Sequence, residues 1–287
     1  MTELSVILTA HNRADLIEET LASLAEQEWD GDWEILFVDN ASTDATPELL
    51  ERWADKMPVP ATLHSATDGQ SCAYARNAGA AISVARSIAF VDDDDVLDPG
   101  WVGAIAEALR DHDYVASRID YTLLNEPAIA ELHSFQTRRL GTFFGVPIVD
   151  GAGSGIRRTL WHDVGGADEE LAFSEDADLG LRIARRGDVI PYFCADAVNH
   201  ARLRTSTSTA WSRGTRRGFA EAELFARHGD AVGVRADRLP VAIARWLRLL
   251  PQLRWTTTET GRAHWSEAAG RRVGRLRGSR ATRRWFP

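Results

Sequence analysis

The sequence predicts an α/β fold in which helices flank a mostly parallel central sheet. Three observations lead to this prediction. Short apolar runs alternate with helical patterns through the first half of the chain, at the spacing of βαβ units. Three of these apolar runs end in polar loops that could bind a ligand, at residues 9–13, 39–44 and 92–95. With 287 residues, 44% of them apolar, the chain is long enough for one large α/β domain and an appendage.

The elements follow one another in a regular order. We expect strands at Leu4–Leu8, Glu34–Val38, Ala61–His64 and Ser87–Val91, because these runs are short, apolar and rich in β-branched residues. We expect helices at residues 14–27 and 71–85. Three more helices are expected: one after a cap at Asp44 or Thr46, with Pro47 in its first turn, one after Asp98 and Pro99, and one from the Glu175-Asp176 pair to about Arg186.

Four consecutive carboxylates, Asp92 to Asp95, end the fourth expected strand. Adjacent acids repel one another, and neither strand nor helix propensity favours them. A divalent cation would stabilise them, because hard cations such as Mg²⁺ or Mn²⁺ take oxygen ligands. The alternative is a solvated acidic turn, or a loop that binds Ca²⁺ without chemistry. The position favours a site, since open α/β sheets bind ligands at the carboxyl ends of their strands.

Two further motifs have open interpretations. The acids Glu175 and Asp176 begin an expected helix, where they either act in chemistry or simply complement the helix dipole. The glycine-rich segment 151–155 permits close approach of a ligand or is a flexible turn. The first strand is not followed by GxGxxG, which counts against a dinucleotide-binding domain, and the chain has no GxxxxGK[ST] motif.

The distribution of charge separates the body of the chain from its tail. The net charge is −9, yet residues 235–287 carry thirteen arginines against three acids. Such a tail faces an anionic partner, either the body itself or another molecule. The sequence shows no charged-then-apolar leader and no apolar run of bilayer length. Its two cysteines lack the spacing of metal ligands and are expected to be buried thiols. We therefore expect a cytoplasmic protein.

Six spaced motifs together resemble the nucleotide-sugar glycosyltransferases of the inverting family 2, which have the Rossmann-like GT-A fold. The resemblance covers residues 4–227. The motifs are SVILTAHNRADLIEETLASL, EILFVDNASTDAT, ARNAGAAIS, IAFVDDDDVLDPGW, GSGIRRTLWHDVGGADEEL and SEDADLGLRIARRG. The resemblance implies transfer of a sugar, expected from a UDP-sugar, to a hydroxyl group of a glycan, a lipid-linked glycan or a small molecule.

The resemblance also implies roles for individual residues. It places these residues in the nucleotide pocket: Thr9, Ala10, Arg13, Asp39, Arg76, Asp92 and Asp93. Asp39 is expected to accept a hydrogen bond from the base, and Arg76 to lie beside base or phosphate. A divalent metal ion, Mn²⁺ or Mg²⁺, is expected on Asp92, Asp94 and His200, although a packed or surface histidine remains the alternative for His200. Glu175 and Asp176 match the ED motif of the family, whose aspartate resembles the catalytic base.

Two other functions are compatible with paired acids on such a sheet. A nucleotidyltransferase would also use them, but its glycine- and lysine-rich first loop is missing from this sequence. A catalytically inactive module that binds nucleotide sugar or Ca²⁺ would not need Asp176, which this chain keeps.

The tail is expected to be a separate, mainly helical extension at residues 231–287, after a domain of residues 1–230 whose halves meet at residue 112. Residues 239–250 form an amphipathic pattern rich in arginine and tryptophan. This segment either packs on the acidic body or lies peripherally on the inner face of a membrane. Nucleic acid is the least favoured partner, because no recognised binding module accompanies the arginines.

Overall fold

The computed structural model describes residues 2–127, 130–131, 139–203, 207–235 and 239–286. The chain divides into two compact units. The sheet unit comprises Met1–Glu169 and Glu175–Leu203, and the helical unit comprises Glu170–Ser174 and Arg204–Pro287. We expected the division near residue 230. It lies earlier because the long helix that begins at Thr207 packs along the last helix of the chain.

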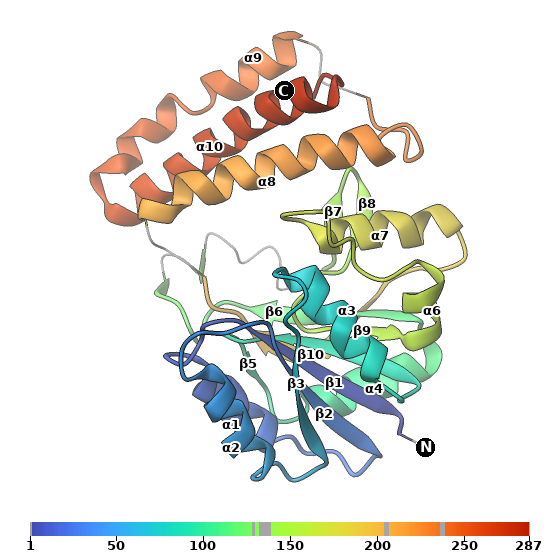
Figure 1. The fold of residues 1–287 in the computed structure, drawn as a ribbon. Helices are drawn as coiled ribbons and strands as arrows, with labels where there is room; N and C mark the ends of the chain where they lie inside the picture. Colours follow the sequence, from blue (N-terminus) through green and yellow to red (C-terminus); the bar gives the residue numbers. More distant parts are fainter. Residues whose placement is uncertain (1, 128–129, 132–138, 204–206, 236–238, 287) are drawn as a thin grey trace. The chain divides into compact units, whose positions relative to one another are not determined.

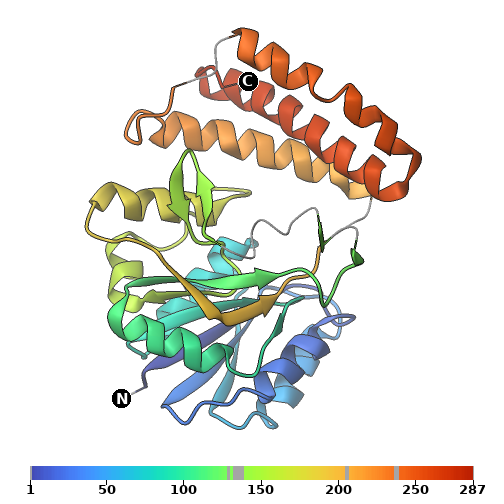
Figure 2. The ribbon, with the colours of Figure 1, turned by 180° about the vertical axis from the view of Figure 1, so that it is seen from behind.

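Among the described residues, eight strands form the central sheet of the sheet unit (Figures 1 and 2). Their order across the sheet is β3 (Ala61–Ser65), β2 (Trp33–Asp39), β1 (Leu4–Ala10), β4 (Ser87–Asp92), β9 (Ser154–Arg157), β6 (Tyr114–Asp120), β10 (Tyr192–His200) and β5 (Val96–Leu97). The strands from β3 to β4 are parallel, as are β6 and β10, whereas β9 and β5 run antiparallel to their neighbours. The prediction of a mostly parallel sheet is confirmed. The two halves expected to meet at residue 112 share this one sheet.

Helices cover both faces of the sheet (Figure 1). The apolar residues of β1 alternate between these faces, as a strand in a buried sheet requires. Leu4, Val6 and Leu8 pack with one helical layer, and Ile7 packs with the other. The first layer contains α1 (Ile17–Ala25), α2 (Thr46–Ala54) and α4 (Trp101–Asp111), and the second contains α3 (Cys72–Ile82), α6 (Arg158–Asp163) and α7 (Glu175–Arg186). A small hairpin of β7 (Gly141–Phe143) and β8 (Val146–Ile148) lies apart from the sheet.

Two helices begin later than we expected. The first begins at Ile17 instead of residue 14, because the Asp44 carboxylate accepts a hydrogen bond from the Ala14 amide and holds the preceding loop (3.1 Å). The helix expected to open at Asp98 and Pro99 begins at Trp101. Before it, the two-residue strand β5 pairs with β10, and the Asp98 carboxylate faces that strand. The expectation for Cys72 was also wrong, because this first residue of α3 is exposed, whereas Cys194 is buried.

The helical unit contains α8 (Thr207–His228), α9 (Leu239–Leu247), the 3₁₀ helix η2 (Pro251–Thr257) and α10 (Glu259–Thr282). Helices α8 and α10 approach each other along glycines spaced four residues apart. A Cβ atom on Gly218 would overlap the backbone oxygen of Arg271, and one on Gly274 would overlap that of Thr215. Within the described stretches, no helix has both the length and the apolar character that a bilayer crossing requires.

Candidate active site

The carboxyl ends of three neighbouring strands bring the predicted nucleotide-binding residues together. Strand register places Ala10 opposite Asp39 on β2, and Thr9 opposite Asp92 on β4. Parallel strands that are buried on both faces keep this register, because a shift of one residue would turn every apolar side chain to the wrong face. The polar loops that the sequence analysis singled out therefore share one edge of the sheet.

Arg13 joins the loop after β1 to the acids after β4. Its guanidinium contacts Asp93 at 2.9 Å and Asp94 at 3.6 Å. The backbone amide of His11 donates a second hydrogen bond to Asp93, at 3.1 Å. Burial raises the pKa of Asp93 to about 6, although Arg13 opposes this shift. Arg13 thus compensates part of the negative charge that the four adjacent acids concentrate at the end of β4.

Asp39 presents one carboxylate oxygen without a partner. The residue is 4% exposed, and its Oδ2 atom accepts a hydrogen bond from the Ser42 amide (3.2 Å). Its Oδ1 atom is buried and has no hydrogen bond from any of the described residues. A buried acceptor of this kind is costly unless a donor meets it. The geometry fits the predicted acceptor for an NH group of a base.

Arg76, on α3, connects the acids of β4 to the acids of α7. It is 5% exposed, and its two terminal nitrogens donate to different carboxylates. One contacts Asp92 and the other contacts Glu175, each at 2.9 Å. Burial opposes the charge, but negative neighbours that include Asp92 and Glu175 raise the pKa of Arg76, so it stays protonated. Gly151 permits this arrangement, since a Cβ atom there would overlap the guanidinium.

Asp176 is the second residue of α7 and is held by backbone amides. Its carboxylate accepts hydrogen bonds from Ala177 (2.7 Å) and from Gly151 (3.3 Å). Burial and the nearby Asp150 raise the pKa of Asp176, although Arg76 and these hydrogen bonds oppose the shift. Burial likewise raises the pKa of Glu175, against the charge of Arg76. The pair therefore contains two carboxylates of increased basicity beside a fixed cation.

In the described part of the chain, the side chains of the predicted metal site do not form a complete set of metal ligands by themselves. His200 contacts Asp98 through its Nε2 atom at 2.8 Å, from the end of β10. Among the described residues no three His, Cys, Asp or Glu side chains are already grouped as a metal site, so a metal ion on Asp92, Asp94 and His200 stays a prediction. Two carboxylates still fit Mg²⁺ or Mn²⁺, because Mg²⁺ is commonly held by one or two carboxylates together with substrate phosphates.

The sequence analysis missed several residues that support the site. Asn199 is fully buried on β10 and donates to the Asp95 carboxylate at 2.7 Å, which fixes the end of the acid cluster. Asn12, Ala41 and Ser174 have φ angles of 52°, 55° and 64°, in the left-handed region that non-glycine residues rarely adopt. Such strain concentrates at functional sites. Asn12 lies in the loop after β1, Ala41 lies in the loop after β2, and Ser174 immediately precedes α7. Asparagine is enriched in this conformation, whereas the alanine and the serine give no local sequence signal for it.

Comparison with known proteins identifies the family. Residues 5–165 match the family model described as glycosyl transferase family 2. The chain is 35% identical over 97 residues to the uncharacterized glycosyltransferase YibD of Escherichia coli and 32% identical over 106 residues to validoxylamine A glucosyltransferase of Streptomyces hygroscopicus. These matches cover 34% and 37% of this chain, but only 27% and 25% of the two relatives.

Solved structures show the same fold. The mannosyltransferase PcManGT of Pyrobaculum calidifontis, solved with GDP-Man and Mn²⁺, aligns with a TM-score of 0.68 at 21% identity, over 96% of this chain and 86% of that one. Residues 1–349 of S. aureus TarS, solved with UDP-GlcNAc, align with a TM-score of 0.55 at 17% identity, over 100% and 93% of the two chains. The fold is thus that of the GT-A glycosyltransferases, and with more than half of its residues matched by the family model the chain belongs to glycosyl transferase family 2.

Proposed function

We propose that the protein is a metal-dependent inverting glycosyltransferase that transfers a sugar from a nucleotide-sugar, a UDP-sugar, to a hydroxyl group. One observation supports this proposal most strongly. Arg76 contacts Asp92 and Glu175 at once, so the acids after β4 and the acids of α7 lie at the same site. Glycosyl transfer needs both groups together, one at the leaving diphosphate and one at the attacking hydroxyl.

The loops at the ends of β1, β2 and β4 are the proposed donor site. Thr9, Ala10 and Asp39 line the nucleoside pocket, and the free Oδ1 atom of Asp39 accepts from the base. Asp92 and Asp94 would hold the divalent ion, which would supply positive charge to the departing diphosphate. Arg13 contacts Asp93 and Asp94, and its guanidinium supplies a cation beside these acids that suits a phosphate group.

Asp176 is the proposed catalytic base. The acceptor oxygen forms a bond to the anomeric carbon as the bond from that carbon to the diphosphate oxygen breaks, and the hydroxyl proton passes to Asp176. Its raised pKa makes it a stronger base than an exposed aspartate. Its two amide contacts fix the direction of the carboxylate. A direct displacement of this kind inverts the anomeric centre. Glu175 holds Arg76 in place and is a positioning residue.

The proposed acceptor is a hydroxyl group of a polysaccharide, a lipid-linked glycan or a small molecule. One of the relatives named above is called a validoxylamine A glucosyltransferase, so glucosyl transfer occurs among the proteins similar to this chain. We also propose peripheral contact of the helical unit with a membrane. Val241, Ile243, Leu247 and Leu250 are between 45% and 58% exposed on α9 and just after it, which is typical of helices that lie in a membrane interface.

A thermal-shift panel tests the donor and the metal together. We expect one class of nucleotide-sugar to raise the melting temperature with Mn²⁺ or Mg²⁺, because ligands stabilise the state that binds them. The shift should disappear with EDTA and in Asp94→Ala. Asp111→Ala, which removes an exposed carboxylate at the end of α4, is the matched control and should keep the full shift. An equal shift in Asp94→Ala, with and without EDTA, would refute the metal role of Asp94.

A further inference from the structure

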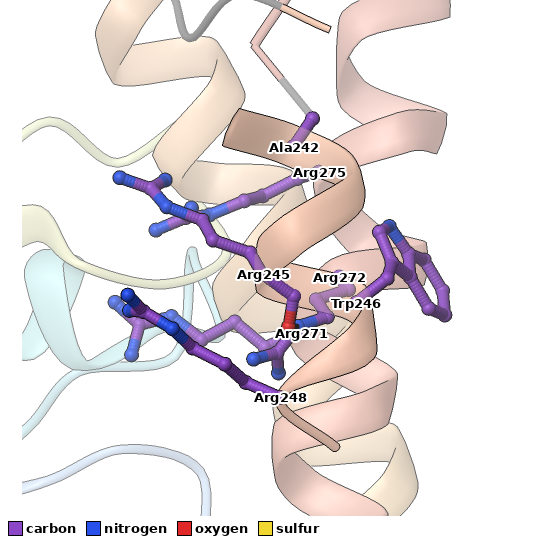
Figure 3. Close-up of a pocket in the computed structure, with 7 residues that line it drawn as sticks. All are labelled: Ala242, Arg245, Trp246, Arg248, Arg271, Arg272 and Arg275. Carbon is purple, nitrogen blue, oxygen red and sulfur yellow. Dashed lines mark hydrogen bonds between the residues drawn. The ribbon is translucent and has the colours of Figure 1, made fainter. Parts of the chain in front are cut away.

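Five arginine side chains surround one cavity in the helical unit, which we call the arginine pocket. The cavity has a volume of about 280 Å³, near the roughly 300 Å³ at which small-molecule sites begin. Its lining comprises Ala242, Arg245, Trp246, Arg248, Arg271, Arg272 and Arg275. Figure 3 shows the guanidinium groups of Arg245, Arg248, Arg271 and Arg275 extending toward the same side, away from Trp246.

One buried carboxylate pairs with two of the arginines that line the pocket. Glu221, which is 1% exposed, contacts both Arg271 and Arg275. Burial opposes its ionisation, but the two arginines lower the pKa of Glu221, so it carries a full negative charge. Glu221 thus pairs with two of the five guanidinium groups that line the cavity. Among the described residues, Arg248 forms no ion pair, and its side chain is exposed at the edge of the cavity.

Arg272 is held in this cationic environment by backbone groups. Its guanidinium donates to the carbonyl oxygens of Arg245 (3.1 Å) and Ala268 (2.8 Å). Burial, and after it the neighbouring arginines, lower the pKa of Arg272. Gathering like charges costs stability unless an anion compensates them. The backbone contacts hold Arg272 at the cavity without neutralising it.

We propose that the arginine pocket is a binding site for a phosphate or diphosphate group. Guanidinium groups bind phosphate oxygens through paired, charge-assisted hydrogen bonds, and several arginines converging on a cavity suit a group with more than one negative charge. Every residue that lines the arginine pocket belongs to the helical unit, and none is among the residues of the proposed donor site. Occupation of the arginine pocket does not depend on Asp176 or on the transfer reaction.

The source of the phosphate group is either a lipid or a soluble compound. Val241, which is 45% exposed and lies one helical turn before Arg245 on α9, favours the lipid. A helix with apolar side chains and arginines places its apolar surface among acyl chains while its cations meet headgroup phosphates. The arginine pocket would then bind the headgroup that the apolar residues approach.

The test compares two double variants of the full chain. Arg245→Gln with Arg248→Gln removes two cations of the pocket, whereas Arg277→Gln with Arg280→Gln removes two exposed cations of α10 that do not line it. The two variants have the same net charge. Binding to inorganic pyrophosphate is measured by calorimetry without divalent cations. Co-flotation is measured with vesicles of phosphatidylcholine, with and without phosphatidate.

Three outcomes are informative. If wild type binds pyrophosphate and phosphatidate vesicles, and the pocket variant alone weakens both at least about tenfold, the site is confirmed with a lipid source. If only pyrophosphate binding shows this pattern, the site is confirmed for a soluble phosphate compound. If wild type binds neither probe, or both variants lose affinity equally, the proposal is overturned, because diffuse charge would then explain the binding. None of these results bears on the donor thermal shift, so the two proposals fail separately.

Discussion

At the scale of single residues, Arg76 is the group on which the candidate site depends. It is almost completely buried, and it contacts one carboxylate from each half of the site. Its contact with Glu175 joins residues 99 positions apart in the sequence. The family resemblance implies that Arg76 lies beside base or phosphate, which stays a prediction; in the structure its two terminal nitrogens donate to Glu175 and Asp92.

Replacing Arg76 with alanine should destabilise the protein strongly. The change leaves Asp92 and Glu175 without their shared cation, so the free energy of unfolding should fall by about 3–5 kcal/mol. Urea denaturation measures this loss. Arg110→Ala is the matched control, because Arg110 pairs with Glu3 at 3.0 Å on the surface and should cost less than about 1 kcal/mol. Similar small losses in both variants would show that the Arg76 bridge is unimportant.

The pH dependence of transfer should respond to Asp150. A neighbouring negative charge disfavours ionisation, and Asp150 contributes to the raised pKa of Asp176. In Asp150→Asn the pKa of Asp176 should fall, so the acid limb of the kcat/KM profile should move to lower pH. The base is active above its pKa, which fixes the sign of the shift. Asp163→Asn, at an exposed carboxylate, should leave the limb in place. An unmoved limb in Asp150→Asn would mean that another group controls it.

At the scale of elements, the glycines between α8 and α10 fix how closely the two helices approach. Gly214 and Gly218 on α8 face Gly270, Gly274 and Gly278 on α10. Each allows backbone atoms of the partner helix to lie where a side chain would stand. This spacing of four residues can be seen in the sequence. It is the signal that could have predicted the packing of α8 against the tail.

Gly218→Ala should therefore destabilise the helical unit. The added methyl group meets the backbone of Arg271, which cannot move without separating the helices. We expect a loss of about 1–3 kcal/mol or more, as for other overpacked sites. Hydrogen exchange in α8 and α10 reports it locally. Gly100→Ala is the control, since its φ is −90° and a Cβ atom there meets nothing within 4 Å. Unchanged exchange in Gly218→Ala would contradict the close approach of the helices.

Local pattern predicted the strands β1 to β4 and the start of α7, because period and composition specify buried parallel strands and helix starts. It did not predict the strands from β5 to β10. The strand β9 is only four residues long, and its place between β4 and β6 depends on pairing across distant parts of the chain. The candidate acids were found from their types and positions. The bridge through Arg76 and the contact of Asp176 with the Gly151 amide are tertiary and left no local signal.

At the scale of the whole molecule, charge and chemistry divide between the two units. The acids of the candidate active site belong to the sheet unit, and the arginine pocket belongs to the helical unit. The net charge of −9 conceals this division, as the count of arginines in the last residues already indicated. Two ligands of different chemistry should therefore act at different places in the chain.

Hydrogen exchange should separate the two sites. A UDP-sugar with Mn²⁺ should slow exchange in the loops at residues 9–13, 39–44 and 92–98, because bound ligands suppress local opening. Inorganic pyrophosphate without metal should slow exchange in α9 and α10 instead. Mass spectrometry of peptides maps both effects. Protection of the same segments by both ligands would argue that one phosphate site explains all of the binding.

The most direct test of the catalytic account is the rate of transfer by Asp176→Asn. Asparagine keeps the size of the side chain but cannot take a proton from the acceptor. We predict that the variant binds the nucleotide-sugar with unchanged affinity, while kcat falls by about 10²–10⁴-fold, the usual contribution of a general base. Turnover within a few-fold of wild type at equal donor affinity would contradict the account, because the acceptor proton would then go to another group.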